Sequence, residues 1–228
     1  MDFLIHGVIK AIHLLLAGDP ETYSAVWVTV RVSAYSMTMS LLAGIPLGFL
    51  LGYTDFRGKQ QIRLAVDTLL ALPTVFIGLL VYAFLSQRGP LGHMGLLFTL
   101  PGIAIGQTLL ALPIVVALSA TAVESMDRQL RFTLVSLGAN RRQLVRGSLW
   151  EVRYGILAAA LTAYGRVMTE VGISMMVGGN IKWHTRTITT AIALETNKGM
   201  FAMGIALGLV LLAIAFAVNF SVSFLRRR

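Results

Sequence analysis

The chain has 228 residues, of which 56% are hydrophobic and only 13% are charged. A single soluble core of this size cannot bury that much apolar side chain, so the composition predicts a protein dissolved largely in lipid. A net charge of +9 would suggest a nucleic-acid partner in a soluble protein, but here the arginines cluster at the ends of apolar runs, where membrane topology and anionic lipid explain them better. The absence of cysteine excludes a disulfide framework and a thiolate metal site.

Five segments are long and apolar enough to cross a bilayer, since about 20 apolar residues span its hydrocarbon. They lie at 25–52, 64–86, 99–123, 155–178 and 200–224. A shorter apolar stretch at 3–17 is interrupted by His6, Lys10 and His13, which is typical of a helix lying in the membrane interface, with a sixth crossing as the alternative. We expect an all-α integral membrane protein with an interfacial helix over residues 1–22 and one transmembrane domain over residues 23–225.

The basic residues are divided unequally between the two sides of the membrane. Twelve lysines and arginines lie in the first loop, the third loop and the C-terminal segment, whereas five lie in the alternate segments. Loops rich in these residues stay in the cytoplasm. The N-terminus is therefore expected outside the inner membrane and the C-terminus inside, which an odd number of crossings allows.

Small residues and prolines recur within the predicted spans. Glycines stand four positions apart in the first, third and fifth spans, a spacing that lets helix backbones approach closely and predicts a packed bundle. The pairs are Gly44 and Gly48, Gly48 and Gly52, Gly102 and Gly106, and Gly204 and Gly208. Four prolines remove backbone donors and are expected to bend or break their helices. These are Pro46, Pro73, Pro101 and Pro113.

The third loop, residues 124–153, carries six arginines and yet keeps apolar residues at helical spacing. Those residues are Leu134, Leu137, Leu144, Val145 and Leu149. A loop that only had to stay hydrated would not need an apolar face, so the pattern predicts docking into another protein. A basic topological loop without a partner is the alternative.

Signatures of catalysis are missing from the sequence. No Gly-x-x-x-x-Gly-Lys-Ser/Thr phosphate loop occurs, because Gly58-Lys59 is followed by Gln60, so the chain is not expected to hydrolyse ATP itself. The four histidines have no carboxylate or cysteine at ligand spacing, and no serine, histidine and acid set is joined by spacing. We expect no enzyme activity, no metal and no cofactor.

The third loop resembles the cytoplasmic loop of the type I permeases of binding-protein-dependent ABC importers. Leu137, Gly138 and Ala139 lie between two helical runs, as in the Glu-Ala-Ala-x-x-x-Gly segment that forms the coupling helix of that family. Two departures are clear: residues 132–134 read Phe-Thr-Leu instead of Glu-Ala-Ala, and Glu151 replaces a downstream proline. The resemblance implies that a short helix near residues 133–146 inserts into an ATPase. Its coupling residues would be Leu137, Gly138, Ala139, Asn140, Arg141 and Arg142.

Residues 165–196 look like the permeases of tungstate importers within that family, and the resemblance extends from about Val26 to the end of the fifth span. It implies the type I ABC importer permease fold, a homodimer of this subunit, two ABC ATPase subunits and an extracytoplasmic oxyanion-binding protein. The expected function is the permease of an ATP-driven importer of tungstate. Molybdate or another oxyanion is the alternative substrate. A stand-alone secondary transporter or channel, and a scaffold protein, are the alternatives from other classes.

Arg166 lies eleven residues into the fourth predicted span, which at a rise of ~1.5 Å per residue places it near the middle of the bilayer. Glu170 is one turn further on the same face, so we expect an ion pair. Either the pair locks helices together, or Arg166 lines the anion path.

Met175, Met176 and Asn180 fall at the outer end of the same span and are candidates for a gate. Thr187 belongs to a hydroxyl-rich run at 185–190 with donors suited to an oxyanion. Lipid-facing methionines and a solvated helix start are the alternatives.

Overall fold

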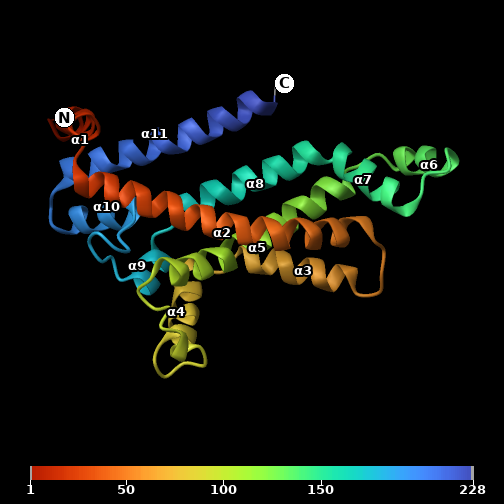
Figure 1. Ribbon diagram of the computed structural model, residues 1–228, viewed down its shortest axis with the longest axis horizontal. Coiled ribbons are helices and arrows are strands. Elements are labelled where there is room, and N and C mark those ends of the chain that lie inside the picture. The colour runs from red at the N-terminus through yellow and green to blue at the C-terminus, as the bar shows by residue number, and fades with distance from the viewer. Residues whose placement is uncertain (1, 227–228) are drawn as a thin grey trace. The chain divides into compact units, whose positions relative to one another are not determined.

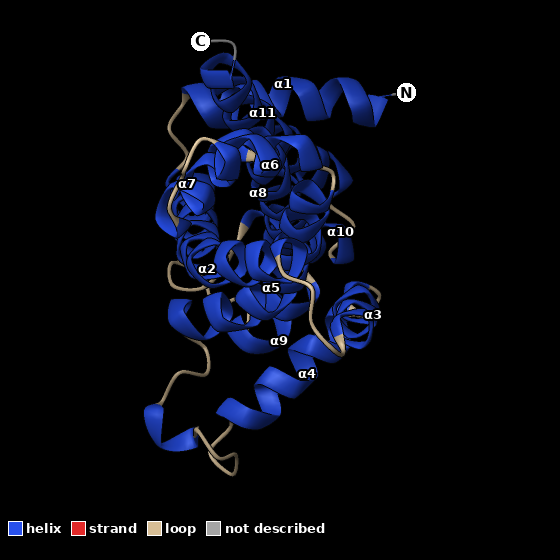
Figure 2. Cartoon of the chain, turned by 90° about the vertical axis from the view of Figure 1, so that its right-hand side faces the viewer, coloured by secondary structure: helices blue, strands red, loops and turns tan. Residues whose placement is uncertain are grey.

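The computed structural model describes residues 2–226, and every regular element in that range is a helix (Figure 2). The all-α expectation is therefore confirmed for the described chain. The elements in order are α1 (Asp2–Leu16), α2 (Pro20–Tyr53), α3 (Lys59–Leu70), α4 (Thr74–Leu85), the short 3₁₀ helix η1 (Gly92–Met94), α5 (Leu100–Glu124), α6 (Arg128–Ser136), α7 (Arg141–Glu151), α8 (Arg153–Met168), α9 (Gly172–Gly178), α10 (Ile188–Asn197) and α11 (Phe201–Arg226).

Three of these helices, α2, α5 and α11, are long and apolar enough to cross a membrane. They match the first, third and fifth predicted spans. The second and fourth spans, predicted as continuous, are each interrupted: α3 is separated from α4 and α8 from α9. By length and composition, five crossings are reached only if each of these pairs crosses as one broken span.

Proline explains one of the two interruptions. Pro73 stands at the N-cap of α4 in an extended conformation, and its ring disfavours helix at the preceding residue. Pro101 lies in the first turn of α5, where a missing N–H costs little. The expected break is wrong at Pro46 and Pro113, because α2 and α5 continue through them.

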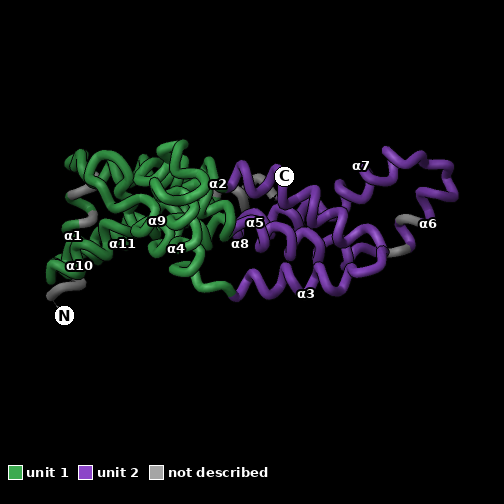
Figure 3. The backbone as a smooth tube through the Cα atoms, turned by 90° about the horizontal axis from the view of Figure 1, so that it is seen from below, with its two compact units in different colours: residues 1–36, 72–110, 164–228 green, residues 37–71, 111–163 purple. Residues whose placement is uncertain are grey.

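The described chain falls into two compact units (Figure 3). Unit 1 comprises Met1–Ser36, Leu72–Leu110 and Tyr164–Arg228. Within it α1 packs along α11, α10 packs on α11, and α4 packs against α9 (Figure 1). The contact between α4 and α9 buries Ile77, Val81, Ile173 and Val177 in one apolar cluster.

Unit 2 comprises Met37–Ala71 and Ala111–Ala163, and its core is the contact between the second halves of α2 and α5. A methyl group added at Gly48 would lie 2.7 Å from the carbonyl oxygen of Val116, and one at Gly52 would lie 2.6 Å from that of Ala120. The predicted close approach of helices at this glycine stripe is therefore confirmed. A methyl group added at Gly208 would have no neighbour within 4 Å among the described residues, so no other helix approaches α11 closely at that glycine.

Candidate functional site

The loop between α5 and α8 folds as a helical hairpin in unit 2. Asp127 begins α6 by accepting a hydrogen bond from the backbone N–H of Gln129 at 2.8 Å. Asn140 begins α7 with a capping box, in which its side chain and that of Gln143 accept from each other's backbone N–H groups. Gly138 lies between the two helices with a φ of +78°. The two helical runs expected on either side of Leu137–Ala139 are therefore present, and the short inserting segment expected near residues 133–146 is divided between α6 and α7 by this turn.

The exposed apolar surface of this hairpin differs from the predicted face. Leu134, Leu144, Val145 and Leu149 are partly buried, and a methyl group at Gly147 of α7 would lie 3.1 Å from Leu134 Cδ1 of α6. Those leucines and the valine are thus partly used within the hairpin. The exposed apolar side chains close to the turn are Leu137 at 78%, Phe132 at 70% and Val135 at 54%. We call these three residues the hairpin patch; sequence reasoning found Leu137 and missed the other two.

The remaining predicted coupling residues lie at the turn beside the hairpin patch. Ala139 is half-buried, while Asn140, Arg141 and Arg142 are exposed at the beginning of α7. Within the described chain, neither of these arginines forms a salt bridge. The six residues are therefore contiguous at one tip, where an apolar group and free cations are available to a partner.

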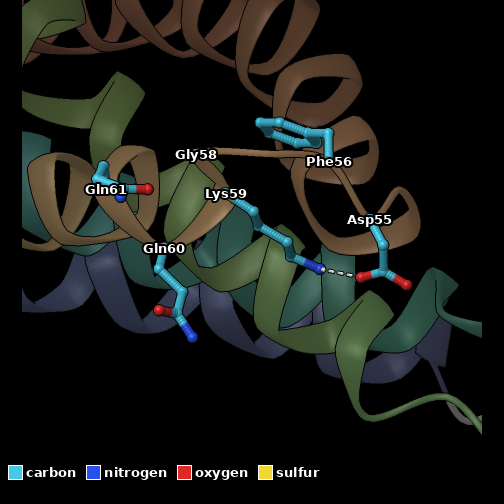
Figure 4. A pocket seen from close by; sticks show the side chains of 6 residues that line it. All are labelled: Asp55, Phe56, Gly58, Lys59, Gln60 and Gln61. Atoms are coloured by element: carbon cyan, nitrogen blue, oxygen red, sulfur yellow. Dashed lines mark ion pairs between the residues drawn. The ribbon is translucent and has the colours of Figure 1, made fainter.

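A second charged cluster in unit 2 links the loop after α2 with α3 and the end of α5. The ammonium of Lys59 lies 3.5 Å from a carboxylate oxygen of Asp55 and 3.5 Å from one of Glu124, and Figure 4 shows Lys59 reaching Asp55. Arg63 lies 3.5 Å from Glu124 and 3.4 Å from Asp67. Sequence reasoning counted Lys59 and Arg63 as topological charges only; in the structure they tie α3 to α5.

The predicted ion pair between Arg166 and Glu170 is present in unit 1, with 3.2 Å between Nη1 and Oε2. The side chain of Glu170 is 2% exposed and that of Arg166 is 43% exposed. The other carboxylate oxygen accepts a hydrogen bond from the backbone N–H of Ile173 at 3.1 Å, in the first turn of α9. Thr189 donates to the carbonyl oxygen of Glu170 at 2.9 Å. The break between α8 and α9 is thus held by polar contacts that end on Glu170.

A buried polar chain that sequence reasoning missed connects three helices of unit 1. The hydroxyl of Ser36 in α2 donates to Gln107 in α5 at 3.3 Å, and the amide of Gln107 donates to Ser174 in α9 at 3.4 Å. All three side chains are buried. Because its groups pair with one another inside the protein, this chain fixes the packing of the three helices.

The predicted gate residues lie around the end of α9. Met175 and Met176 are half-buried, and Gly179 ends the helix with a positive φ. Asn180 follows in the same left-handed region and accepts a hydrogen bond from Arg186 Nε at 3.2 Å. Arg186 in turn pairs with Glu21, at the start of α2. These contacts tie the segment after α9 to the start of α2.

The hydroxyl-rich run after that segment is engaged within the protein. Thr187 is 2% exposed and begins α10 with a capping box shared with Thr190. Thr185 donates to the carbonyl of Gly178, and Thr189 to that of Glu170. Each of the four hydroxyls has a structural partner, and the run is a helix start that is buried, not solvated as the alternative had it.

The described residues also bear on a resident metal. Over residues 2–226, no three His, Asp or Glu side chains come together in an arrangement that could hold one. Unit 1 offers a half-exposed cation beside a helix break, and unit 2 offers an exposed apolar tip on its hairpin.

Comparison with known proteins identifies relatives along nearly the whole chain. The family model described as the binding-protein-dependent transport system inner membrane component matches residues 44–228. The tungstate uptake system permease protein of Campylobacter jejuni is 47% identical over 93% of this chain and 89% of its own length. The equivalent protein of Peptoclostridium acidaminophilum is 37% identical over 93% of both chains. The crystal structure of a bacterial alginate ABC transporter, in complex with a periplasmic protein bound to an alginate pentasaccharide, has a chain that superposes with a TM-score of 0.76, at 18% identity, covering 95% of this chain and 82% of that one.

Proposed function

The chain belongs to the family of inner membrane components of binding-protein-dependent transport systems, and from that premise we propose that it is the permease subunit of an ATP-driven tungstate importer. The observation that supports tungstate as the substrate is the 47% identity with a tungstate uptake permease along 93% of the chain. The fold is that of type I ABC importer permeases. ATP hydrolysis belongs to a separate subunit, in keeping with the lack of a phosphate loop in this sequence.

We propose that the partners are an ABC ATPase, an extracytoplasmic binding protein that delivers the oxyanion, and a second copy of this chain. The hairpin patch of Phe132, Val135 and Leu137 supports the first of these, because exposed apolar side chains flanked by arginines fit a protein groove. The excess of lysine and arginine in alternate loops supports a cytoplasmic C-terminus and an N-terminus outside. In this orientation the hairpin faces the ATPase.

Leu137, Gly138, Ala139, Asn140, Arg141 and Arg142 are the proposed coupling residues. Closure of the ATPase dimer on ATP would move the hairpin and, through α8, the helix break at Glu170 as connected rigid elements. Arg166 is the proposed anion contact in the path, because its guanidinium is 43% exposed even while it is paired. Met175, Met176 and Asn180 are the proposed gate beside it, and Thr187 supports the gate by fixing the start of α10.

The test is reconstitution of this chain with its ATPase and binding protein in liposomes, followed by uptake of tungstate with and without ATP. Uptake that needs ATP and all three components is the expected result. Uptake by this subunit alone would favour a channel or secondary transporter and contradict the proposal. Molybdate and sulfate added as competitors decide the substrate, because tungstate uptake that molybdate suppresses at lower concentration than unlabelled tungstate would assign molybdate instead.

A further inference from the structure

The junction between α7 and α8 carries an arginine held between two aromatic rings. The guanidinium of Arg153 lies 4.4 Å from the ring centroid of Trp150 and 4.4 Å from that of Tyr154. Its Nη1 donates to the carbonyl oxygen of Trp150, which fixes the side chain further. The indole of Trp150 is nevertheless 69% exposed. An apolar ring and a positioned cation therefore face outward together.

The same surface continues along α7. Arg142, Arg146 and Trp150 follow one another at intervals of four residues, so they lie on one face of the helix, and both arginines are exposed. In the part of the chain that the structure describes, no carboxylate lies within salt-bridge distance of Arg142, Arg146 or Arg153. Residues 141–154 contain four arginines and one glutamate, so the segment has a net charge of +3. These cations lack the counter-charge that Glu124 supplies to Lys59 and Arg63.

The position of this surface along the chain indicates what kind of molecule binds to it. Trp150 lies in the last turn of α7 and Arg153 begins α8, which together with α9 is apolar enough to cross a membrane. Exposed tryptophan and arginine at the end of a span lie at the level of the lipid headgroups. Arg146 lies in α7 and Arg153 begins α8, and the helical rise of the residues between them adds up to ~10 Å. The headgroup layer on one side of a bilayer is slightly thinner, roughly 5–8 Å.

We propose that Arg146, Trp150, Arg153 and Tyr154 form a binding site for one anionic phospholipid of the adjoining leaflet. Arg146 and Arg153 contact the phosphate, for which the guanidinium fork is suited, and the two rings lie at the boundary of the acyl chains. A free phosphate would leave the indole in water. A protein partner is better served by the hairpin patch at the opposite end of α7, since charged residues are depleted from the centre of protein interfaces.

The experiment uses Trp150 as its own reporter. The chain has three tryptophans, so the double replacement Trp27→Phe and Trp183→Phe leaves Trp150 alone. This protein, in complex with its ATPase in nanodiscs, is titrated with brominated phosphatidylglycerol or brominated phosphatidylcholine, which quench indole fluorescence on contact. We expect phosphatidylglycerol to quench at a mole fraction at least tenfold lower.

The matched variants separate this site from its alternatives. Arg146→Gln with Arg153→Gln is expected to remove roughly 25-fold of the preference, about fivefold for each arginine. Arg57→Gln, which removes an exposed arginine of the other basic loop, is expected to leave the preference intact. Equal quenching by both lipids in the parent protein, reversal by inorganic phosphate, or loss of ATPase binding with the lipid preference unchanged would each overturn the proposal. Retained thermal unfolding transitions establish that the variants are folded.

Discussion

The ion pair between Arg166 and Glu170 is asymmetric, and the asymmetry predicts which partner the protein can lose. Glu170 is 2% exposed, whereas Arg166 is 43% exposed. Arg166→Gln therefore leaves a buried carboxylate with the N–H of Ile173 as its remaining partner. Glu170→Gln leaves a half-exposed cation, which water in the proposed path would solvate, and the new amide oxygen can still accept from Ile173. We expect the first substitution to be the more destabilising.

The magnitudes follow from the same exposures. Removing one partner of a buried ion pair costs about 3–5 kcal/mol, which applies to Arg166→Gln. The loss of a hydrogen bond between charged groups costs about 1.5–3 kcal/mol, and solvation of Arg166 places Glu170→Gln at the lower end. The double replacement removes the orphaned charge as well as the pair, so it is expected to cost less than Arg166→Gln alone. The coupling between the two sites is expected to be about 1–3 kcal/mol.

Thermal unfolding of the purified complex in one detergent measures these differences. At about 2–4 °C per kcal/mol for a chain of this size, Arg166→Gln is expected to lower the midpoint by about 6–20 °C and Glu170→Gln by about 3–6 °C. Oxyanion uptake by the variants that stay assembled tests the path role separately. A larger loss from Glu170→Gln than from Arg166→Gln, or strict additivity in the double variant, would refute the reasoning from burial.

Two further substitutions test the helix contact and the hairpin. Gly48→Ala is expected to lower the free energy of unfolding by about 1–3 kcal/mol, because the added methyl group would lie 2.7 Å from a backbone oxygen of α5. Gly208→Ala is the matched control, since nothing lies within 4 Å of its added methyl group. Equal unfolding midpoints for the two variants would contradict the packing argument. Gly138→Asp is expected to weaken ATPase binding about tenfold or more and to uncouple hydrolysis from uptake, because it adds a charge beside the hairpin patch. The neutral Gly138→Asn, which tolerates the φ of +78°, is expected to retain more binding. Normal coupled uptake by the aspartate variant would argue against docking at this tip.

The sequence predicts where the long helices lie because span length and apolar composition are local properties. It does not predict which prolines interrupt them. Pro46 is flanked by Gly44 and Gly48, both packed against α5, so the turns on either side are held in place while α2 continues. Pro73 is the N-cap of α4, and the chain breaks there. The difference depends on tertiary packing, which no local pattern contains.

The apolar face of the hairpin was misassigned for a related reason. The apolar face predicted over residues 134–149 was assigned to a helix pair, but the sequence does not say how the two helices turn toward each other on either side of Gly138. In the structure Leu134 packs toward α7, while Phe132 and Val135 turn outward. The capping box of Asn140 and Gln143 is the local signal that marks the start of α7.

Contacts in the membrane site were predictable when they joined residues close in sequence and unpredictable when they joined distant ones. The pair of Arg166 and Glu170 follows from a spacing of four residues. The chain of Ser36, Gln107 and Ser174 joins residues at least 67 positions apart and left no sequence signal. The sequence identifies the threonines at 185–190 as hydrogen-bond donors, but only the fold shows which acceptors they bind.

The central claim is that the hairpin lies in the cytoplasm and is covered by an ATPase. Because the natural chain has no cysteine, Leu137→Cys introduces a unique thiol at a side chain that is 78% exposed, and Asn197→Cys, exposed at the end of α10, provides the control for the outer side. A membrane-impermeant maleimide is expected to label residue 197 and spare residue 137 in intact cells. In inverted vesicles it should label residue 137 after the ATPase is stripped and lose that labelling when the ATPase rebinds. Labelling of residue 137 in intact cells, or labelling that the ATPase leaves unchanged, would contradict the account.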